Sequence, residues 1–255
     1  MRILRESNLL RFRGCLRIFI TYHSVRDWLG KRLVIAIDGP AGSGKSTTAR
    51  LVAKALGYLH VDTGAMYRAV TLKFLRNGVR PDDAAAVTAL LQKTRVELKK
   101  TGETLQVLLD GEDVSKEIRT PEVSRATSAV SSLRQVREVM VREQRALGTD
   151  GGIVLEGRDI GTVVFPDADL KIFLVAGLEE RARRRMEELR AQGVQADLPT
   201  ILADMRERDR LDSTRTESPL RRAADAVEVD TTGLTIEAQV ERIVELARKA
   251  EGERA

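Results

Sequence analysis

A glycine-rich stretch, GPAGSGKS at residues 39–46, has the residue types and spacing of a phosphate-binding loop. Glycine permits backbone angles that are closed to other residues, so successive N–H groups can turn inward around an anion. The side chain of Lys45 can reach the β and γ oxygens of a nucleotide, and the hydroxyl of Ser46 can bind Mg2+. The stretch therefore predicts a site for a nucleoside triphosphate with a magnesium ion at Ser46.

The segments on either side of this loop are the ones that such a site needs. Residues 33–37 are a short apolar run typical of a strand, and residues 46–56 have the composition of a helix. The positive end of that helix dipole would point at the bound phosphates. An ordinary glycine-rich turn is the alternative, but the complete motif between a strand and a helix favours nucleotide binding. The predicted nucleotide ligands are Gly39, Pro40, Ala41, Gly42, Ser43, Gly44, Lys45, Ser46 and Thr47.

Three charged residues in RDRLDSTR, namely Arg208, Asp212 and Arg215, are spaced i, i+4 and i+7. On a continuous helix they would share one face, where two guanidinium groups could hold phosphate while the carboxylate accepts from a hydroxyl or an amine. The same spacing fits a solvated helix face with an ion pair worth only about 0.3–0.5 kcal/mol. The spacing alone fits both interpretations equally.

A second charged pair, Arg158 and Asp159, lies between glycines in EGRDIGT, directly after a predicted strand at residues 151–155. Open α/β sheets bind their ligands at the carboxyl ends of the strands, so this position favours a functional pair over a structural turn. Arg68 follows the Asp-Thr-Gly corner at residues 62–64 by one helical turn and either faces the same site or lies on the surface.

The helix predicted at residues 178–192 contains four arginines in five positions, Arg181 and Arg183–Arg185. Such a cluster is ordinarily a solvated face, but in a phosphoryl-transfer enzyme it would be a lid that supplies cations. Phosphoryl transfer depends on in-line positioning, charge neutralisation and exclusion of water more than on covalent help. Many arginines and only two histidines suit that chemistry.

The order of the predicted elements indicates the fold class. Strands alternate with helices through most of the chain, which predicts a parallel sheet flanked by helices. Residues 95–118 differ, because short strand-like segments are separated there by Thr101-Gly102 and Asp110-Gly111 and predict a small antiparallel sheet. The other predicted strands are 58–61, 171–175 and 226–229, and the other predicted helices are 65–77, 81–93, 133–147, 198–212 and 236–250.

Composition excludes several classes of protein. The 255 residues are 42% hydrophobic, 32% charged and only 4% aromatic, which disfavours a base-stacking platform for single-stranded nucleic acid. One cysteine excludes a disulfide framework, and no apolar run approaches the ~18 residues of a membrane span. Residues 1–32 contain eight Lys and Arg and only two acidic residues. Because the net charge of the whole chain is +5, the remaining residues sum to about −1. This body has no basic bias toward nucleic acid.

Six segments together resemble the signatures of the bacterial cytidylate kinase (CMP kinase) family, in the same order and over about residues 33–250. They are IAIDGPAGSGKST, DTGAMYRA, GEDVSKEIRTPEV, EGRDIGTVVFPDADLKIFL, RDRLDSTR and SPLRRAADAVEVDTT. The first is shared with many P-loop families, whereas EGRDIGTVVFPDA and the segment at 110–123 are much more specific.

The resemblance implies the nucleoside monophosphate kinase fold and its activity. The kinase domain would span 33–255, with a monophosphate-binding insert at about 94–128 and a lid at about 178–212. A basic extension at 1–32 is expected to be poorly ordered and to have no part in the chemistry. The implied reaction uses ATP and Mg2+ to convert CMP and dCMP to CDP and dCDP in pyrimidine nucleotide metabolism. The implied enzyme is a cytoplasmic monomer without nucleic-acid or membrane partners.

The family's functional residues transfer to matching positions here. The resemblance implies that phosphate is held by Arg68, Arg158, Arg208 and Arg215, and that cytosine is surrounded by Thr63, Ser128, Arg137 and Asp159. Asp212, with Arg208, would meet the ribose hydroxyls. The implied catalytic residues are Lys45, Arg158, Arg208 and Arg215, and the implied lid cations are Arg181, Arg184 and Arg185. Thr63 stands where the family pattern has serine, which retains the hydroxyl and adds a methyl group.

Two alternatives belong to other classes. Another P-loop small-molecule kinase, with UMP or shikimate as the acceptor, shares the core; a shikimate kinase should lack the inserted sheet and the cytosine-binding residues. A non-catalytic nucleotide switch should not need the three charged residues of RDRLDSTR opposite the phosphate-binding loop.

Overall fold

The computed structural model describes residues 17–21, 32–101, 104–191 and 193–253. The chain divides into two compact units: residues 1–28 and 65–143 form unit 1, and residues 29–64 and 144–255 form unit 2. The poor order expected for the basic extension concerns residues that mostly lie outside the described ones. Within it, Arg17–Thr21 forms strand β1.

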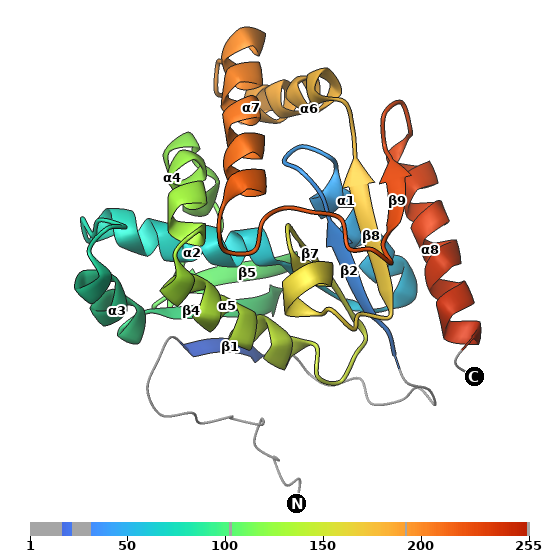
Figure 1. The fold of residues 1–255 in the computed structure, drawn as a ribbon, viewed down its shortest axis with the longest axis horizontal. Helices are drawn as coiled ribbons and strands as arrows, with labels where there is room; N and C mark the ends of the chain where they lie inside the picture. Colours follow the sequence, from blue (N-terminus) through green and yellow to red (C-terminus); the bar gives the residue numbers. More distant parts are fainter. Residues whose placement is uncertain (1–16, 22–31, 102–103, 192, 254–255) are drawn as a thin grey trace, which may run out of the picture. The chain divides into compact units, whose positions relative to one another are not determined.

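Unit 2 is built on a parallel sheet with the strand order β3-β7-β2-β8-β9 (Figure 1). The bounds are β2 Val34–Asp38, β3 Leu59–Asp62, β7 Ile153–Gly157, β8 Leu170–Val175 and β9 Val227–Asp230. The central strand β2 pairs with β7 and β8, with Ile35 opposite both Val154 and Leu170. Its inner residues are fully buried, which explains why it reads as a continuous apolar run in the sequence. The predicted parallel sheet is confirmed.

Helices of unit 2 form two separate packing groups. The bounds are α1 Lys45–Leu56, α6 Leu178–Ala191, α7 Leu198–Thr214 and α8 Ile236–Gly252, with a single-turn π-helix η2 at Ile160–Val164. Helices α1 and α8 pack on each other beside the sheet, where Val52 and Ile243 join the buried core around Leu174 (Figure 1). Helices α6 and α7 have their own small core, made by Ala182, Leu189, Ile201 and Met205. The α6–α7 pair is thus held together independently of the sheet.

Unit 1 contains the predicted small sheet, whose strand order is β1-β4-β5-β6. Its other strands are β4 Arg95–Thr101, β5 Thr104–Leu109 and β6 Glu112–Asp113. Its helices are α2 Thr63–Arg76, α3 Ala84–Gln92, η1 Glu117–Arg119, α4 Pro121–Ser131 and α5 Arg134–Leu147. The unit includes α2 only from Ala65 and α5 only up to Glu143. Strands β4, β5 and β6 are antiparallel neighbours, and β1 adds a parallel strand beside β4. Asp110 and Gly111 have φ angles of 53° and 92°, which the tight turn between β5 and β6 requires.

Three local predictions were wrong. The last strand-like segment predicted within residues 95–118 gives only two paired residues, Glu112 and Asp113, because Ser115 turns back and donates from its backbone N–H and its hydroxyl to Asp113. The turn predicted at residues 62–64 is absent, and α2 starts at Thr63, whose hydroxyl donates to the Glu156 carbonyl at 2.6 Å. The helix predicted from Pro81 begins only at Ala84, after Asp83 as its N-cap.

Among the residues that the structure describes, none of the helices is both long and apolar enough to pass through a membrane.

Candidate active site

The glycine-rich loop lies between the end of β2 and the start of α1, as the sequence predicts. At Gly39, with φ 151°, a Cβ atom would lie 2.2 Å from the Leu174 carbonyl oxygen of the neighbouring strand. Gly44 has φ 87° and forms the N-cap of α1 without any side-chain cap, so the first N–H groups of the helix face the loop. Both positions require glycine, and the geometry suits an anion at the helix start.

Lys45 is held over this loop. Its side chain is only 6% exposed, and Nζ donates to the Pro40 carbonyl at 2.6 Å and to Ser43 Oγ at 3.4 Å. Burial lowers the pKa of Lys45 well below its usual value, and the nearby Arg158 and Arg208 guanidinium groups lower it further, against Glu156 and Asp38. The donor lysine therefore lies within electrostatic reach of two of the predicted acceptor arginines.

The hydroxyl of Ser46, the predicted magnesium ligand, donates to Glu156 Oε2 at 2.7 Å. The other carboxylate oxygen of Glu156 lies 3.1 Å from His60 Nε2. A hydroxyl beside a carboxylate is a set of hard oxygen donors, which suits a Mg2+ ion that takes its remaining ligands from phosphates and water. Within the described residues there is no cluster of three or more His, Cys, Asp or Glu for a metal held by protein alone. Sequence reasoning missed Glu156, whose contact spans 110 positions of the chain.

Arg158 and Asp212 form a partly buried ion pair, with 2.9 Å between Nε and Oδ2. Burial acts to raise the pKa of Asp212, but Arg158, Arg208 and Arg215 together hold it below its usual value. The carboxylate is therefore charged at neutral pH and offsets part of the positive charge of three arginines. Asp212 was expected to meet the ribose together with Arg208, and in this structure it accepts from Arg158.

Arg215 also belongs to this cluster, but it does not lie on the helix face that its spacing from Arg208 suggested. Helix α7 ends at Thr214, and Arg215 is its extended C-cap, so the proposed i+7 position on one helix face is wrong. Arg215 Nε donates to the Ser218 carbonyl at 2.6 Å, and its NH2 lies 3.8 Å from Asp159 Oδ1. The chain after α7 folds back, with Leu220 N donating to the Asp212 carbonyl at 2.7 Å. The cluster is tertiary and not a helix face.

The segment after β7 presents Arg158 and Asp159, and a carboxylate from another strand fixes it. Asp38, the last residue of β2, accepts from the backbone N–H groups of Ile160 at 2.9 Å and Gly161 at 2.8 Å. Burial raises the pKa of Asp38 to about 6, and the nearby Asp159 carboxylate also raises it. The two N–H donors and Lys45 act in the opposite direction and lower this pKa. Sequence reasoning missed Asp38, although a carboxylate directly before the glycine-rich loop was a visible signal.

The three predicted lid cations have different surroundings. Arg181 is buried and donates to the Ala41 carbonyl of the loop at 3.0 Å and to Asp209 of α7 at 2.7 Å. Arg184 donates to the Thr231 carbonyl at 2.8 Å, and its NH1 would lie 3.7 Å from a Cβ at Gly44. Arg185 pairs with Glu188 on the same helix at 3.0 Å. Arg181 and Arg184 thus lie at the glycine-rich loop.

The remaining predicted acceptor ligands belong to unit 1. Arg68 lies on α2, Ser128 on α4 and Arg137 on α5. Arg137 is 4% exposed, donates to the Ser131 carbonyl at 3.2 Å and has its guanidinium carbon 5.6 Å from the centroid of the Tyr67 ring. A cation over an aromatic face at this distance is attracted by the ring quadrupole.

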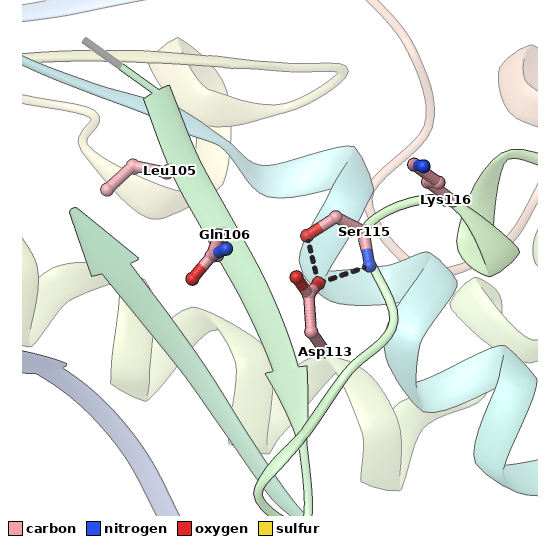
Figure 2. Close-up of a pocket in the computed structure, with 5 residues that line it drawn as sticks. All are labelled: Leu105, Gln106, Asp113, Ser115 and Lys116. Atoms are coloured by element: carbon pink, nitrogen blue, oxygen red, sulfur yellow. Dashed lines mark hydrogen bonds between the residues drawn. The ribbon is translucent and has the colours of Figure 1, made fainter. Parts of the chain in front are cut away.

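A separate hollow lies on the small sheet of unit 1. Figure 2 shows Asp113 and Ser115 joined by two hydrogen bonds at its edge, with Leu105, Gln106 and Lys116 as its other lining residues. None of these five residues is a predicted ligand. Its lining has no buried charge, so we assign no chemistry to it.

The chain is similar to proteins of one family over most of its length. The family model for cytidylate kinase matches residues 35–249. The cytidylate kinase of Bacillus pumilus (strain SAFR-032) is 51% identical over 221 residues, covering 87% of this chain and 98% of that protein. The cytidylate kinase of Pelotomaculum thermopropionicum is 54% identical over 221 residues, covering 86% of this chain and 97% of that protein. The cytidylate kinase of Geobacter sulfurreducens is 48% identical over 223 residues, covering 87% of this chain and 96% of that protein. Among solved structures, a gluconokinase from Sinorhizobium meliloti 1021 is 13% identical with a TM-score of 0.47, and the match covers 88% of this chain and 97% of that one. The chain belongs to the cytidylate kinase family.

Proposed function

We propose that this protein transfers the γ-phosphoryl group of ATP to CMP and dCMP, giving CDP or dCDP and ADP. The observation that supports this most directly is the 2.7 Å hydrogen bond from Ser46 of the donor loop to Glu156, which lies two residues before Arg158 of the acceptor cluster. A nucleotide-binding switch has no need for a second cationic cluster beside the donor lysine. Membership of the cytidylate kinase family favours CMP over shikimate as the acceptor.

The reaction needs no side-chain nucleophile. An oxygen of the CMP phosphate forms the new bond to the γ-phosphorus, and the bond from that phosphorus to the bridging oxygen of ADP breaks in line. Lys45 and the loop N–H groups hold the donor phosphates, while Arg158, Arg208 and Arg215 balance the charge where the two phosphates meet. Two anions can approach only when such cations offset their repulsion.

Mg2+ would be held by Ser46, with Glu156 beside it, and would neutralise charge on the donor phosphates when bound. Of the lid cations, Arg181 and Arg184 already contact the loop or its neighbours, and Arg185 belongs to the same proposal. These residues would exclude water and complete the cationic surroundings of the donor.

Base and sugar recognition completes the proposal. Asp159 would accept from the exocyclic amine of cytosine, and Arg137, Thr63 and Ser128 would meet its acceptors and edges, as the sequence resemblance implies. Arg68 would add a phosphate contact, and Asp212 a ribose contact shared with Arg208. A monomeric cytoplasmic enzyme without nucleic-acid or membrane partners stays a prediction.

A coupled assay of ADP release, run with CMP, dCMP, UMP, AMP and shikimate as acceptors at saturating ATP and Mg2+, tests the assignment. We expect CMP and dCMP to give the highest kcat/KM, UMP a lower one, and AMP and shikimate little turnover. A clear preference for AMP or shikimate over CMP contradicts the proposed function.

A further inference from the structure

We propose that Asp38 is a positioning residue that holds in place the acceptor-binding turn from which Arg158 and Asp159 project. The proposal rests on the proposed function for its kinetic consequence. Its structural basis is a pair of hydrogen bonds between elements far apart in the sequence: Asp38 ends β2, and its partners Ile160 and Gly161 follow β7 by 122 and 123 positions.

The start of the π-helix η2 is bonded by a residue of another strand. The first N–H groups of any helix lack partners within the helix, and an Asp at the preceding position ordinarily satisfies them with its own side chain. Asp159 occupies that N-cap position and makes no side-chain cap bond. The N–H groups of Ile160 and Gly161 are bonded by the Asp38 oxygens instead, one oxygen for each.

The side chain of Asp159 is directed away from the start of η2. One oxygen of its carboxylate lies 3.8 Å from Arg215 NH2. The turn is also closed tightly, since a Cβ at Gly161 would lie 3.2 Å from the Lys171 side chain and 3.4 Å from Asp38 Oδ2. Asp38 therefore fixes the backbone from which Arg158 and Asp159 project.

Charged groups of two other segments act on the Asp38 carboxylate. The groups that act on Asp38 are the carboxylate of Asp159, which repels it, and the ammonium of Lys45, which attracts it, besides the two N–H donors. Lys171 packs its carbon chain on Gly161, but its Nζ is bonded to Asp225 and the Pro166 carbonyl. Because the pKa of Asp38 is raised to about 6, mild acid protonates its carboxylate. One of the two oxygens then carries the proton and becomes a weaker hydrogen-bond acceptor.

Amide chemical shifts test the contact without any substrate. In 1H–15N spectra of the unliganded protein, the amides of Ile160 and Gly161 should move together between pH 7.5 and 4.5, with a midpoint at about 6. This titration should vanish in Asp38→Asn and persist in Asp167→Asn, a matched change at an exposed aspartate of the same segment. Amides at 160 and 161 that do not titrate in the wild type overturn the proposal, and this arm needs no variant to fold.

Kinetics test the functional half. The Asp38→Asn amide can accept from only one of the two N–H groups and presents its own NH2 to the other. We expect it to lower kcat/KM for CMP at least tenfold, with KM for CMP rising more than KM for ATP, while Asp167→Asn stays within twofold of the wild type. Wild-type kcat/KM for CMP in a folded Asp38→Asn overturns the positioning role. If the wild type itself does not phosphorylate CMP, the proposed function fails, and the amide titration still decides whether Asp38 holds the turn.

Discussion

The donor loop and the acceptor cluster of unit 2 both bind phosphate in the proposed reaction, but they are built in opposite ways. The donor loop is one continuous stretch, residues 39–47, whose shape follows from glycines with φ angles closed to other residues and from the helix that follows. The acceptor cluster joins the turn after β7, the end of α7 and the extended chain beyond it. Its charged groups come together only through the tertiary fold.

This difference determines how each region tolerates change. A glycine in the donor loop is required by a local contact, as at Gly39, where any side chain would meet the backbone of β8. In the acceptor cluster the two carboxylates pair with arginines, Asp212 with Arg158 and Asp159 with Arg215. Substitutions in the loop should therefore affect turnover with little effect on stability when they leave the glycines alone, whereas substitutions in the cluster should affect both.

The largest effect is expected for Lys45→Ala. Removing the ammonium from the donor phosphates should lower kcat by about 10²–10³, the usual loss for a group that stabilises transition-state charge. The fold should remain intact, because burial and Arg158 already oppose the charge of Lys45 in the folded protein. Steady-state kinetics and thermal unfolding measure the two effects, with Lys54→Ala, an exposed lysine on the same helix, as the control. A Lys45→Ala enzyme with near wild-type turnover would contradict the donor role.

Sequence reasoning succeeded where the determining contacts are local. The glycine-rich loop between a strand and a helix was predictable because the motif, its strand and its helix are contiguous. The antiparallel insert was predictable because Asp110-Gly111 is a turn signal that needs no distant partner. The parallel sheet followed from alternating strands and helices, which only a few topologies accommodate.

Sequence reasoning failed where contacts between residues far apart in the chain determine the structure. The predicted helix end at 212 is close to the observed end at Thr214, but the i, i+4, i+7 spacing could not show that Arg215 lies beyond the helix in extended backbone. Asp38 and Glu156 went unnoticed because their partners lie more than a hundred residues away. A carboxylate at the end of a buried strand can be bonded to water, to metal or to another backbone segment, and only the fold distinguishes these.

The next largest effects should separate the two adjacent residues of the cluster, Arg158 and Asp159. Arg158→Ala should lower kcat/KM for CMP and UMP alike, by about 10–100-fold, because both acceptors have the same phosphate. Asp159→Ala should lose about tenfold more with CMP than with UMP, since uracil presents a carbonyl where cytosine has an amine and a mispaired buried polar group costs roughly 1–3 kcal/mol. The measurement is kcat/KM for each variant with each acceptor. Equal losses on CMP and UMP for Asp159→Ala would remove it from base recognition.

A smaller effect, on stability, is expected for Asp212→Asn. Net attraction to three arginines lowers the pKa of Asp212 in the folded protein, so its contribution is present above its unfolded pKa of about 3.9 and is lost as pH falls through the folded pKa. At pH 7 the variant should be less stable by about 1–3 kcal/mol. The gap to the wild type should shrink below about pH 4.

Urea unfolding at pH 7 and at pH 3 measures that gap, with Asp204→Asn, an exposed aspartate on the same helix, as the control. A gap that widens in acid would show that the arginines do not stabilise the charged form of Asp212.

The smallest effect is expected at the lid surface, where Arg185→Ala breaks a solvated pair with Glu188. Such a pair contributes only about 0.2–1 kcal/mol, so thermal stability should hardly change. If Arg185 turns toward the donor phosphates during the reaction, kcat/KM for ATP should still fall by about two- to fivefold, the loss that corresponds to one exposed charge contact. Arg183→Ala is the matched control, because Arg183 is more exposed and pairs with glutamates of the same helix. Identical kinetics for the two variants would remove Arg185 from the donor site and restrict the lid cations to Arg181 and Arg184.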